Sequence, residues 1–165
     1  MFDIDFRKKG ELVLHTRKFL LYPPYWSERN NQILHNLVWN SVEFNDQNHT
    51  LIPEESGLYC FVVCPGYTNF VECKYLFYVG KTNRTLKTRY KEYLYEQEGK
   101  GKPRGKVFEM LKMYKDHLYF QYTTLDDSSL IDLYEERLLN TFVPFVNTSI
   151  PNALVNSELK NIYEN

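Results

Sequence analysis

An arginine and a glutamate fall on helix faces that the hydrophobic pattern assigns to the protein interior. In the segment 128–142, Ile131 and Leu138 belong to one apolar stripe at helical spacing, and Glu135 falls inside that stripe. A carboxylate on a buried face is costly unless it is paired with a cation or bound to a metal. Arg89 lies at the edge of a similar stripe, where it could pair with Glu135 or hold an anionic phosphate. Arg89 is therefore a candidate for binding an anion, and Glu135 is a candidate for binding a cation.

A second group of candidates surrounds the stretch YVGKT at 78–82. Its Gly-Lys-Thr ending matches the end of a nucleotide-binding loop, but that loop needs a glycine where this chain has Tyr75. The stretch KYLFYVG reads as a bulky strand, which cannot wrap closely around a polyphosphate. We therefore expect no nucleotide cofactor, and Gly80 and Lys81 need another explanation.

The elements expected to position these residues are short strands and amphipathic helices. Runs rich in β-branched and aromatic residues predict three strands, at 57–63, 74–80 and 117–125. The first two are expected to form an antiparallel hairpin. The helical patterns predict three helices, at 85–98, after the loop 99–106 to about 114, and at 128–142 with Ser128 or Ser129 as its N-cap. This order predicts an α/β (α+β) fold, in which helices flank a small three-stranded antiparallel sheet.

The segment before residue 56 is expected to be a partly helical N-terminal extension. The apolar run at 12–22 fits a strand or a short helix, and Ser27 is expected to cap a helix that continues to about Val42. The polar stretch 43–56 is expected to be a loop that ends at the domain boundary. The chain then divides into three parts: an extension (1–55), a main domain (56–148) and a C-terminal tail (149–165).

The main domain resembles the GIY-YIG nuclease family. Gly-Leu-Tyr at 57–59 and Tyr-Val-Gly at 78–80 resemble the paired tripeptides that name the family, with Leu58 and Val79 replacing isoleucine. Lys81 follows the second tripeptide, as a lysine often does in that family. The further residues that follow in the family's order are Arg89, Tyr93 (a histidine in some members), Glu135 and Asn147. The resemblance covers about residues 56–148.

This resemblance implies hydrolysis of phosphodiester bonds in DNA with Mg²⁺ or Mn²⁺ as the cofactor. It implies that Glu135 binds the metal, which stabilises the leaving 3′ oxygen. It also implies that Arg89 neutralises the charge that develops on the phosphoryl oxygens. These two residues would then carry the electrostatic part of the reaction.

The same resemblance implies roles for the tyrosines. Tyr59 is the first candidate for orienting or deprotonating the attacking water, although a phenol with a pKa of about 10 would need a nearby cation. Tyr78 and Tyr93 would position the phosphate and the water by hydrogen bonds. Whether Tyr59, Tyr93 or Lys81 is the general base stays open, and Asn147 is expected to fix the end of the last helix.

The charge distribution suggests a nucleic-acid footprint although the formal net charge is only −1. Residues 56–115 carry twelve basic and five acidic side chains, whereas residues 116–165 carry two and eight. A concentrated basic segment suits a phosphate backbone, although a solvated helix face has the same pattern. The residues expected to bind DNA are Lys87, Lys91, Lys100, Lys102, Arg104 and Lys106. The last four belong to the loop GKGKPRGK, which could order on DNA or could be simply solvated.

The remaining composition limits the class of protein. No apolar run has the length of a membrane span, the N-terminus does not look like a secretory signal, and three cysteines do not form a paired framework. We therefore expect a cytoplasmic protein without a membrane partner. A restriction- or defence-type endonuclease, acting as a possible homodimer on double-stranded DNA, is the first interpretation. A repair or recombination nuclease for branched DNA and an inactive nucleic-acid-binding protein of the same fold are the alternatives.

Overall fold

A four-stranded antiparallel sheet lies at the centre of the structure, a computed structural model that describes residues 6–21, 23–26, 34, 36–66 and 73–150. The strand order is β1-β4-β2-β3. The four strands are β1 (Asn40–Glu43), β2 (Gly57–Val63), β3 (Tyr75–Thr82) and β4 (Leu118–Thr124). The expected hairpin is confirmed, because β2 pairs antiparallel with β3. The fold is therefore mixed α/β, and β3 is an edge strand.

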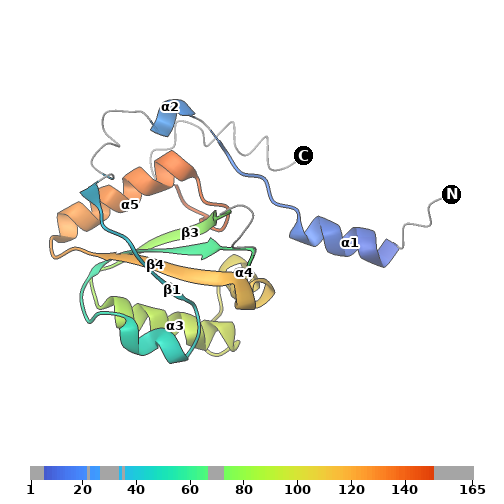
Figure 1. Cartoon of the computed structure of the whole chain (residues 1–165), viewed down its shortest axis with the longest axis horizontal. Helices are drawn as coiled ribbons and strands as arrows, with labels where there is room; N and C mark the ends of the chain where they lie inside the picture. Colours follow the sequence, from blue (N-terminus) through green and yellow to red (C-terminus); the bar gives the residue numbers. More distant parts are fainter. Residues whose placement is uncertain (1–5, 22, 27–33, 35, 67–72, 151–165) are drawn as a thin grey trace.

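Helices cover both faces of this sheet (Figure 1). On one face lie α3 (Leu86–Gln97) and α4 (Gly105–Met113), and on the other lies α5 (Ser128–Phe142). The alternation of side chains along β2 explains how one strand serves two cores. Tyr59 and Phe61 pack with residues of α3 and α4, whereas Leu58 and Cys60 pack with residues of α5. All seven residues of β2 are accordingly buried.

The sheet has one strand more than expected. Residues 40–42, predicted as the end of a helix, instead form β1 together with Glu43, and this strand pairs antiparallel with β4. The apolar residues of that segment do not share one face: Leu34 and Leu37 pack into the core on the α5 side, whereas Val42 packs into the core on the α3 side. The free edge of β4 offers backbone hydrogen bonds, which here outweigh the local helical pattern. The expected N-cap of that helix, Ser27, lies outside the described residues.

The segment from residue 40 to residue 55 packs as part of the same body as the main domain. It contains a 3₁₀ helix, Gln47–Leu51, in the stretch that was expected to be a loop. The hydroxyl of Tyr90 on α3 donates to the carbonyl of Asn45 at 2.8 Å, and the amide of Leu86 donates to the carbonyl of Glu55 at 2.8 Å. Two of the three buried residues of α3, Leu86 and Tyr90, are thus hydrogen-bonded to residues that were expected to lie in the extension.

Two further helices precede the sheet, α1 (Phe6–His15) and α2 (Pro23–Trp26). The apolar run at 12–22 begins in α1, which lies to one side of the sheet in Figure 1, and continues without regular structure to residue 21. Among the helices that the structure describes, none combines the length and the apolar character that crossing a bilayer requires.

The caps of the two long helices fix where the site helices begin. Thr85 caps α3, and its hydroxyl accepts a hydrogen bond from the amide of Thr88 at 3.0 Å. At α5 the cap is Asp127, whose carboxylate accepts from the amide of Ser129 at 2.8 Å. The prediction that Ser128 or Ser129 caps this helix is therefore wrong by one or two residues. Asp127 suits the position because a carboxylate also interacts favourably with the helix dipole.

Candidate active site

The candidate site is organised around Gly80, in the edge strand β3. Gly80 is paired with Tyr59 of β2, and the Tyr59 ring lies directly over it. A Cβ atom at position 80 would lie 2.6 Å from both Cζ and Oη of Tyr59, which is too close for any side chain. The glycine is thus explained by the close approach of a ring, which carries the Tyr59 hydroxyl from the central strand onto the edge strand.

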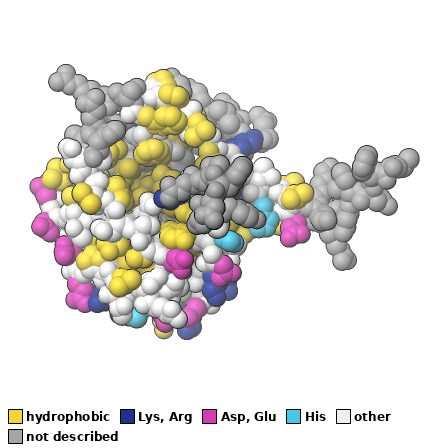
Figure 2. Space-filling view, viewed as in Figure 1, with side chains coloured by type: hydrophobic (Ala, Val, Ile, Leu, Met, Phe, Trp, Pro, Cys, Tyr) yellow, Lys and Arg dark blue, Asp and Glu magenta, His cyan; other side chains and the backbone are white. Residues whose placement is uncertain are grey.

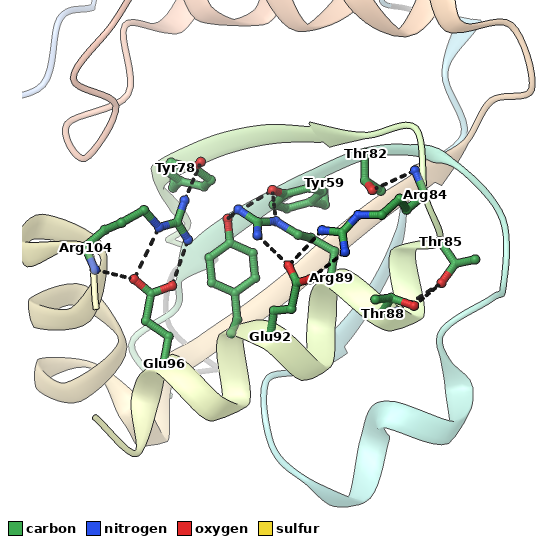
Figure 3. A network of polar contacts seen from close by, with 11 residues as sticks. Tyr59, Tyr78, Thr82, Arg84, Thr85, Thr88, Arg89, Glu92, Glu96 and Arg104 are labelled. Carbon is green, nitrogen blue, oxygen red and sulfur yellow. Dashed lines mark hydrogen bonds and ion pairs between the residues drawn. The ribbon is translucent and has the colours of Figure 1, made fainter. Parts of the chain in front are cut away.

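Arg89 holds the Tyr59 hydroxyl in place (Figure 3). Its Nε donates to Tyr59 Oη at 2.9 Å, and its Nη2 donates to Tyr93 Oη at 3.2 Å. The two tyrosine hydroxyls are hydrogen-bonded to each other at 3.0 Å. On its outer side Arg89 donates from Nη1 to the carboxylate of Glu92 at 2.6 Å. The sequence-predicted Tyr59, Arg89 and Tyr93 therefore form one connected cluster on the α3 face of the sheet.

The pKa values of this cluster favour neutral tyrosines. Burial, followed by the proximity of Tyr78, raises the pKa of Tyr59 to about 12, although Arg89 acts in the opposite direction. Burial also raises the pKa of Tyr93 well above its ordinary value. A nearby cation was expected to lower the pKa of Tyr59, and Arg89 is such a cation, but burial outweighs it. The Tyr59 hydroxyl is therefore suited to hydrogen bonding rather than to accepting a proton from a water molecule.

Tyr78 lies beside the cluster of Tyr59, Arg89 and Tyr93, and Arg104 contacts both Tyr78 and Tyr93. Arg104 Nη1 lies 3.5 Å from Tyr78 Oη, and its guanidinium carbon is 5.0 Å from the ring centre of Tyr93. The carboxylate of Glu96 accepts from Nη2 of Arg104 at 2.8 Å and from Nε at 3.2 Å. Arg104 was expected in a loop that could order on DNA or be simply solvated. It is the N-cap residue of α4 and reaches into the tyrosine cluster.

Lys81 and Glu135 meet on the other face of the sheet. Successive side chains of a strand point to opposite faces, so Lys81 points toward α5 when Gly80 faces α3. Lys81 Nζ lies 2.7 Å from the Glu135 carboxylate and 3.0 Å from the Asp132 carboxylate. The Glu135 side chain is 19% exposed. The carboxylate is therefore largely buried and paired, but its partner is Lys81. The alternative that Glu135 pairs with Arg89 is wrong, because Arg89 pairs with Glu92.

The charge state of Lys81 follows from these contacts. Burial lowers the pKa of its ammonium group, but hydrogen bonds and charge interactions with Glu135 and Asp132 raise it, and the net shift is upward. Lys81 is therefore protonated at neutral pH. A protonated lysine cannot accept a proton, so Lys81 does not fit the role of general base in this arrangement.

The predicted residues thus form two groups that flank one strand, not one crevice on one face. Tyr59, Arg89 and Tyr93 lie on the α3 face, and Lys81 and Glu135 lie on the α5 face. The two groups meet at β3, where Gly80 lies under the Tyr59 ring and Lys81 is the next residue. A substrate that contacts both groups would have to lie along this edge. The helix periodicities located both buried faces correctly, but they do not specify on which side of the sheet each helix packs.

Asn147 covers the neighbouring part of the same edge. Its Oδ1 accepts from the amide of Val79 at 2.9 Å, and its Nδ2 donates to the carbonyl of Val79 at 2.8 Å. The amide of Val146 donates to the carbonyl of Phe77 at 2.9 Å. The expectation that Asn147 fixes the end of the last helix is corrected, because it fixes the chain after α5 to β3. This cover reaches the residue before Gly80.

The α5 face offers carboxylate ligands for a hard cation. Asp132 was not predicted as a site residue, although its position three residues before Glu135 places both side chains on one helix face. In the part of the chain that the structure describes, no His, Cys, Asp and Glu side chains form a group of three or more with metal-binding geometry. One or two carboxylates, completed by water and substrate oxygens, fit the ordinary coordination of Mg²⁺. The residues present therefore fit the implied metal.

The basic residues predicted to bind DNA are distributed over α3 and the chain that follows it. Lys87 pairs with Glu54 at 2.9 Å, and Lys100 pairs with Glu98 at 2.5 Å. Lys91, Lys102 and Lys106 are exposed. An open groove of about 440 Å³ runs along α3, and its lining includes Lys91, Lys100, Lys102, Thr88 and Tyr95, together with Glu92 and Glu96. Figure 2, by contrast, shows a face with hydrophobic side chains in its middle and only a few lysines or arginines.

The charged partners Glu92 and Glu96 were also not identified from the sequence. They lie one helical turn apart on α3, and each accepts hydrogen bonds from an arginine of the tyrosine cluster. Their i, i+4 spacing is visible in the sequence, but nothing in the local pattern indicates that the arginine partner of Glu96 is eight residues away.

In the comparisons with known proteins, the chain matches no family model, no curated protein and no solved structure.

Proposed function

We propose that this chain is a metal-dependent endonuclease of the GIY-YIG type that hydrolyses phosphodiester bonds in DNA. The observation that carries the proposal is the Tyr59 hydroxyl, which Arg89 and Tyr93 hold over Gly80 on an edge strand. A guanidinium and two phenols beside an edge strand suit a phosphodiester, since the guanidinium can neutralise phosphate and the phenols can donate and accept hydrogen bonds. The Lys81–Glu135 pair across the same strand adds a carboxylate for the metal.

In this proposal each residue has a physical task. Arg89 neutralises the negative charge that grows on the non-bridging phosphate oxygens as water attacks. Tyr59 and Tyr93, being neutral, orient the attacking water and the phosphate through their hydroxyls. When bound, the metal ion supplies Lewis-acid stabilisation of the leaving 3′ oxygen, and Glu135, aided by Asp132, would hold it. Lys81 keeps a positive charge beside these carboxylates.

The biological class of the nuclease is part of the same proposal. It is a restriction- or defence-type enzyme that acts on double-stranded DNA in the cytoplasm, where thiols that form no disulfide, such as Cys60 and Cys73, persist. One such site cuts one strand, so a double-strand break would require a homodimer or two successive events.

The proposal is tested by incubating the protein with supercoiled plasmid and Mg²⁺ or Mn²⁺, with EDTA as the control. We expect metal-dependent nicking or linearisation. Linear fragments with defined ends would support a restriction-type enzyme, whereas cutting confined to added branched substrates would support a repair or recombination nuclease. DNA binding without any cutting would reduce the proposal to a nucleic-acid-binding protein.

Two substitutions connect the activity to the site. Arg89→Ala is expected to slow cutting by about 10²–10³-fold, the usual loss when one preorganised donor is removed. Glu135→Gln is expected to abolish cutting, whereas the matched variant Glu136→Gln, one position away on α5, is expected to leave it intact. Equal effects of the two glutamine variants would contradict the metal assignment, and activity of Arg89→Ala within a few-fold of the native protein would contradict the role of Arg89.

A further inference from the structure

The tyrosine cluster contains a second guanidinium that the proposed reaction does not use. Arg104 approaches the Tyr93 ring to 5.0 Å, and Arg89 approaches the same ring to 4.6 Å. The two guanidinium groups are therefore less than about 10 Å apart, since each lies within 5.0 Å of one ring centre. Arg89 contacts the hydroxyls of Tyr59 and Tyr93, whereas Arg104 contacts the hydroxyl of Tyr78.

Both guanidiniums are arranged in the same way. Figure 3 shows two Glu–Arg pairs side by side along α3, Glu92 with Arg89 near Tyr59 and Glu96 with Arg104 near Tyr78. Glu96 and Glu92 are four residues apart, so the pairs are separated by one helical turn of about 5.4 Å. Each arginine thus lies between a tyrosine hydroxyl and a glutamate carboxylate.

The pair of Glu96 and Arg104 has the geometry of an arginine that binds an oxyanion. Two nitrogens of the guanidinium, Nη2 and Nε, donate to the two carboxylate oxygens of Glu96, at 2.8 and 3.2 Å. The two non-bridging oxygens of a phosphodiester, which share one negative charge, accept the same fork of donors. The Arg104 side chain is 42% exposed, so a phosphate can reach it from solvent. The Glu96 carboxylate therefore occupies a position that suits a phosphate oxygen pair.

We propose that Arg104 binds a second phosphate, next to the one at Arg89 on the same strand, and that Glu96 occupies its guanidinium in the free protein. This inference rests on the proposed function, which places the reacting phosphate at Arg89. Successive phosphates of one strand advance by about 3.4 Å along the duplex axis, so two guanidiniums less than about 10 Å apart can hold neighbouring phosphates. The groove lined by Lys91, Lys100 and Lys102 also has Glu92 and Glu96 in its lining, so it adjoins both Glu–Arg pairs.

The arrangement also predicts how Glu96 sets the affinity for DNA. In the free protein its carboxylate neutralises Arg104, and a phosphate that binds must displace it or share the guanidinium with it. Removing the charge of Glu96 should therefore strengthen binding. If the pair served only to hold the start of α4, through the 2.7 Å hydrogen bond from the Arg104 amide to Glu96, its loss would weaken the fold without strengthening binding.

The test measures binding of a fluorescent 20-base-pair duplex in EDTA, over a range of salt concentrations, so that no cutting occurs. Arg104→Ala should weaken binding about tenfold and reduce the slope of log affinity against log salt by about 0.9, the value for one lost phosphate contact. Glu96→Gln should tighten binding by about threefold or more. Lys115→Ala, which removes an exposed charge outside the cluster, is the matched control and should change the slope less.

Thermal unfolding of each variant separates binding from folding. If Arg104→Ala does not fold, Arg104→Lys keeps the charge but cannot form the fork, and it should keep the slope while losing part of the affinity. The inference is overturned if Arg104→Ala leaves the slope of log affinity against log salt unchanged, or if Glu96→Gln does not gain DNA affinity. In that case the proposed function still stands, provided that the native protein cuts plasmid. A native protein that neither binds the duplex nor cuts plasmid would reject both.

Discussion

Replacing Gly80 by alanine tests the contact on which the site is built. The added methyl group would lie 2.6 Å from Cζ and Oη of Tyr59 and 2.8 Å from its Cε2, so either the ring or the strand must move. Neither is free: the ring is buried, stacks on Phe120 at 5.3 Å and is hydrogen-bonded to Arg89, and β3 is hydrogen-bonded to β2. Overpacking of a well-packed core typically costs about 1–3 kcal/mol. We expect the upper half of that range.

The free energy of unfolding from urea titration, together with the melting temperature, measures this cost. For a domain of this size about 2–3 kcal/mol corresponds to a melting temperature lower by about 4–12 °C. Gly105→Ala is the matched control, because nothing lies within 4 Å of a Cβ at that position. The cost of Gly80→Ala should fall substantially when Tyr59→Leu is also present. A Gly80→Ala variant as stable as Gly105→Ala, or an equal cost in the Tyr59→Leu background, would refute the contact.

Three further predictions concern pH, the covered edge and the buried thiol. Folding raises the pKa of Tyr59 to about 12 from its ordinary value of 10.0, so the neutral hydroxyl contributes stability below pH 10 that is lost between about pH 10 and 12. Tyr59→Phe should therefore lose less unfolding free energy over that pH range than the native protein. Identical pH profiles for the two proteins would contradict this. Asn147→Ala removes the side-chain hydrogen bonds to the amide and the carbonyl of buried Val79, so it should lower the free energy of unfolding in urea by about 2 kcal/mol. A decrease of less than about 0.5 kcal/mol would argue against the role of Asn147 in covering the edge of β3. Burial raises the pKa of the Cys60 thiol, so a thiol reagent such as DTNB should modify Cys60 only in denaturant, and its rapid labelling in the folded protein, mapped by mass spectrometry, would contradict the burial.

The hairpin, the third strand and the last helix were predictable because their local pattern and their tertiary environment agree. The run 57–63 is rich in β-branched and aromatic residues, and the structure buries every residue of it. Residues 40–43 lack such a pattern, and they form a strand only because β4 offers them a free edge. A strand recruited in this way depends on a partner some 80 positions later in the chain, which no local window contains.

The site was predictable to a similar extent. Helical periodicity identified Arg89 and Glu135 as charges on buried faces, and the structure gives each of them an ionic partner. Periodicity reports that a face is buried, but not against which side of a sheet, so the separation of the two residues by β3 could not be foreseen. Asp132 and Glu96 were missed because a charged residue on an outer helix face looks the same whether it is solvated or paired.

The central claim is that the two groups on either side of β3 act on one phosphodiester. The most direct test compares the single-turnover cutting rates of Arg89→Ala, Glu135→Gln and the double variant in Mn²⁺, at enzyme concentrations high enough to detect residual activity. Residues that act as a unit show strongly non-additive losses, so we predict that the double variant is no slower than the slower single variant. A double variant whose loss equals the product of the two single losses, or single variants that cut as fast as the native protein, would contradict the account.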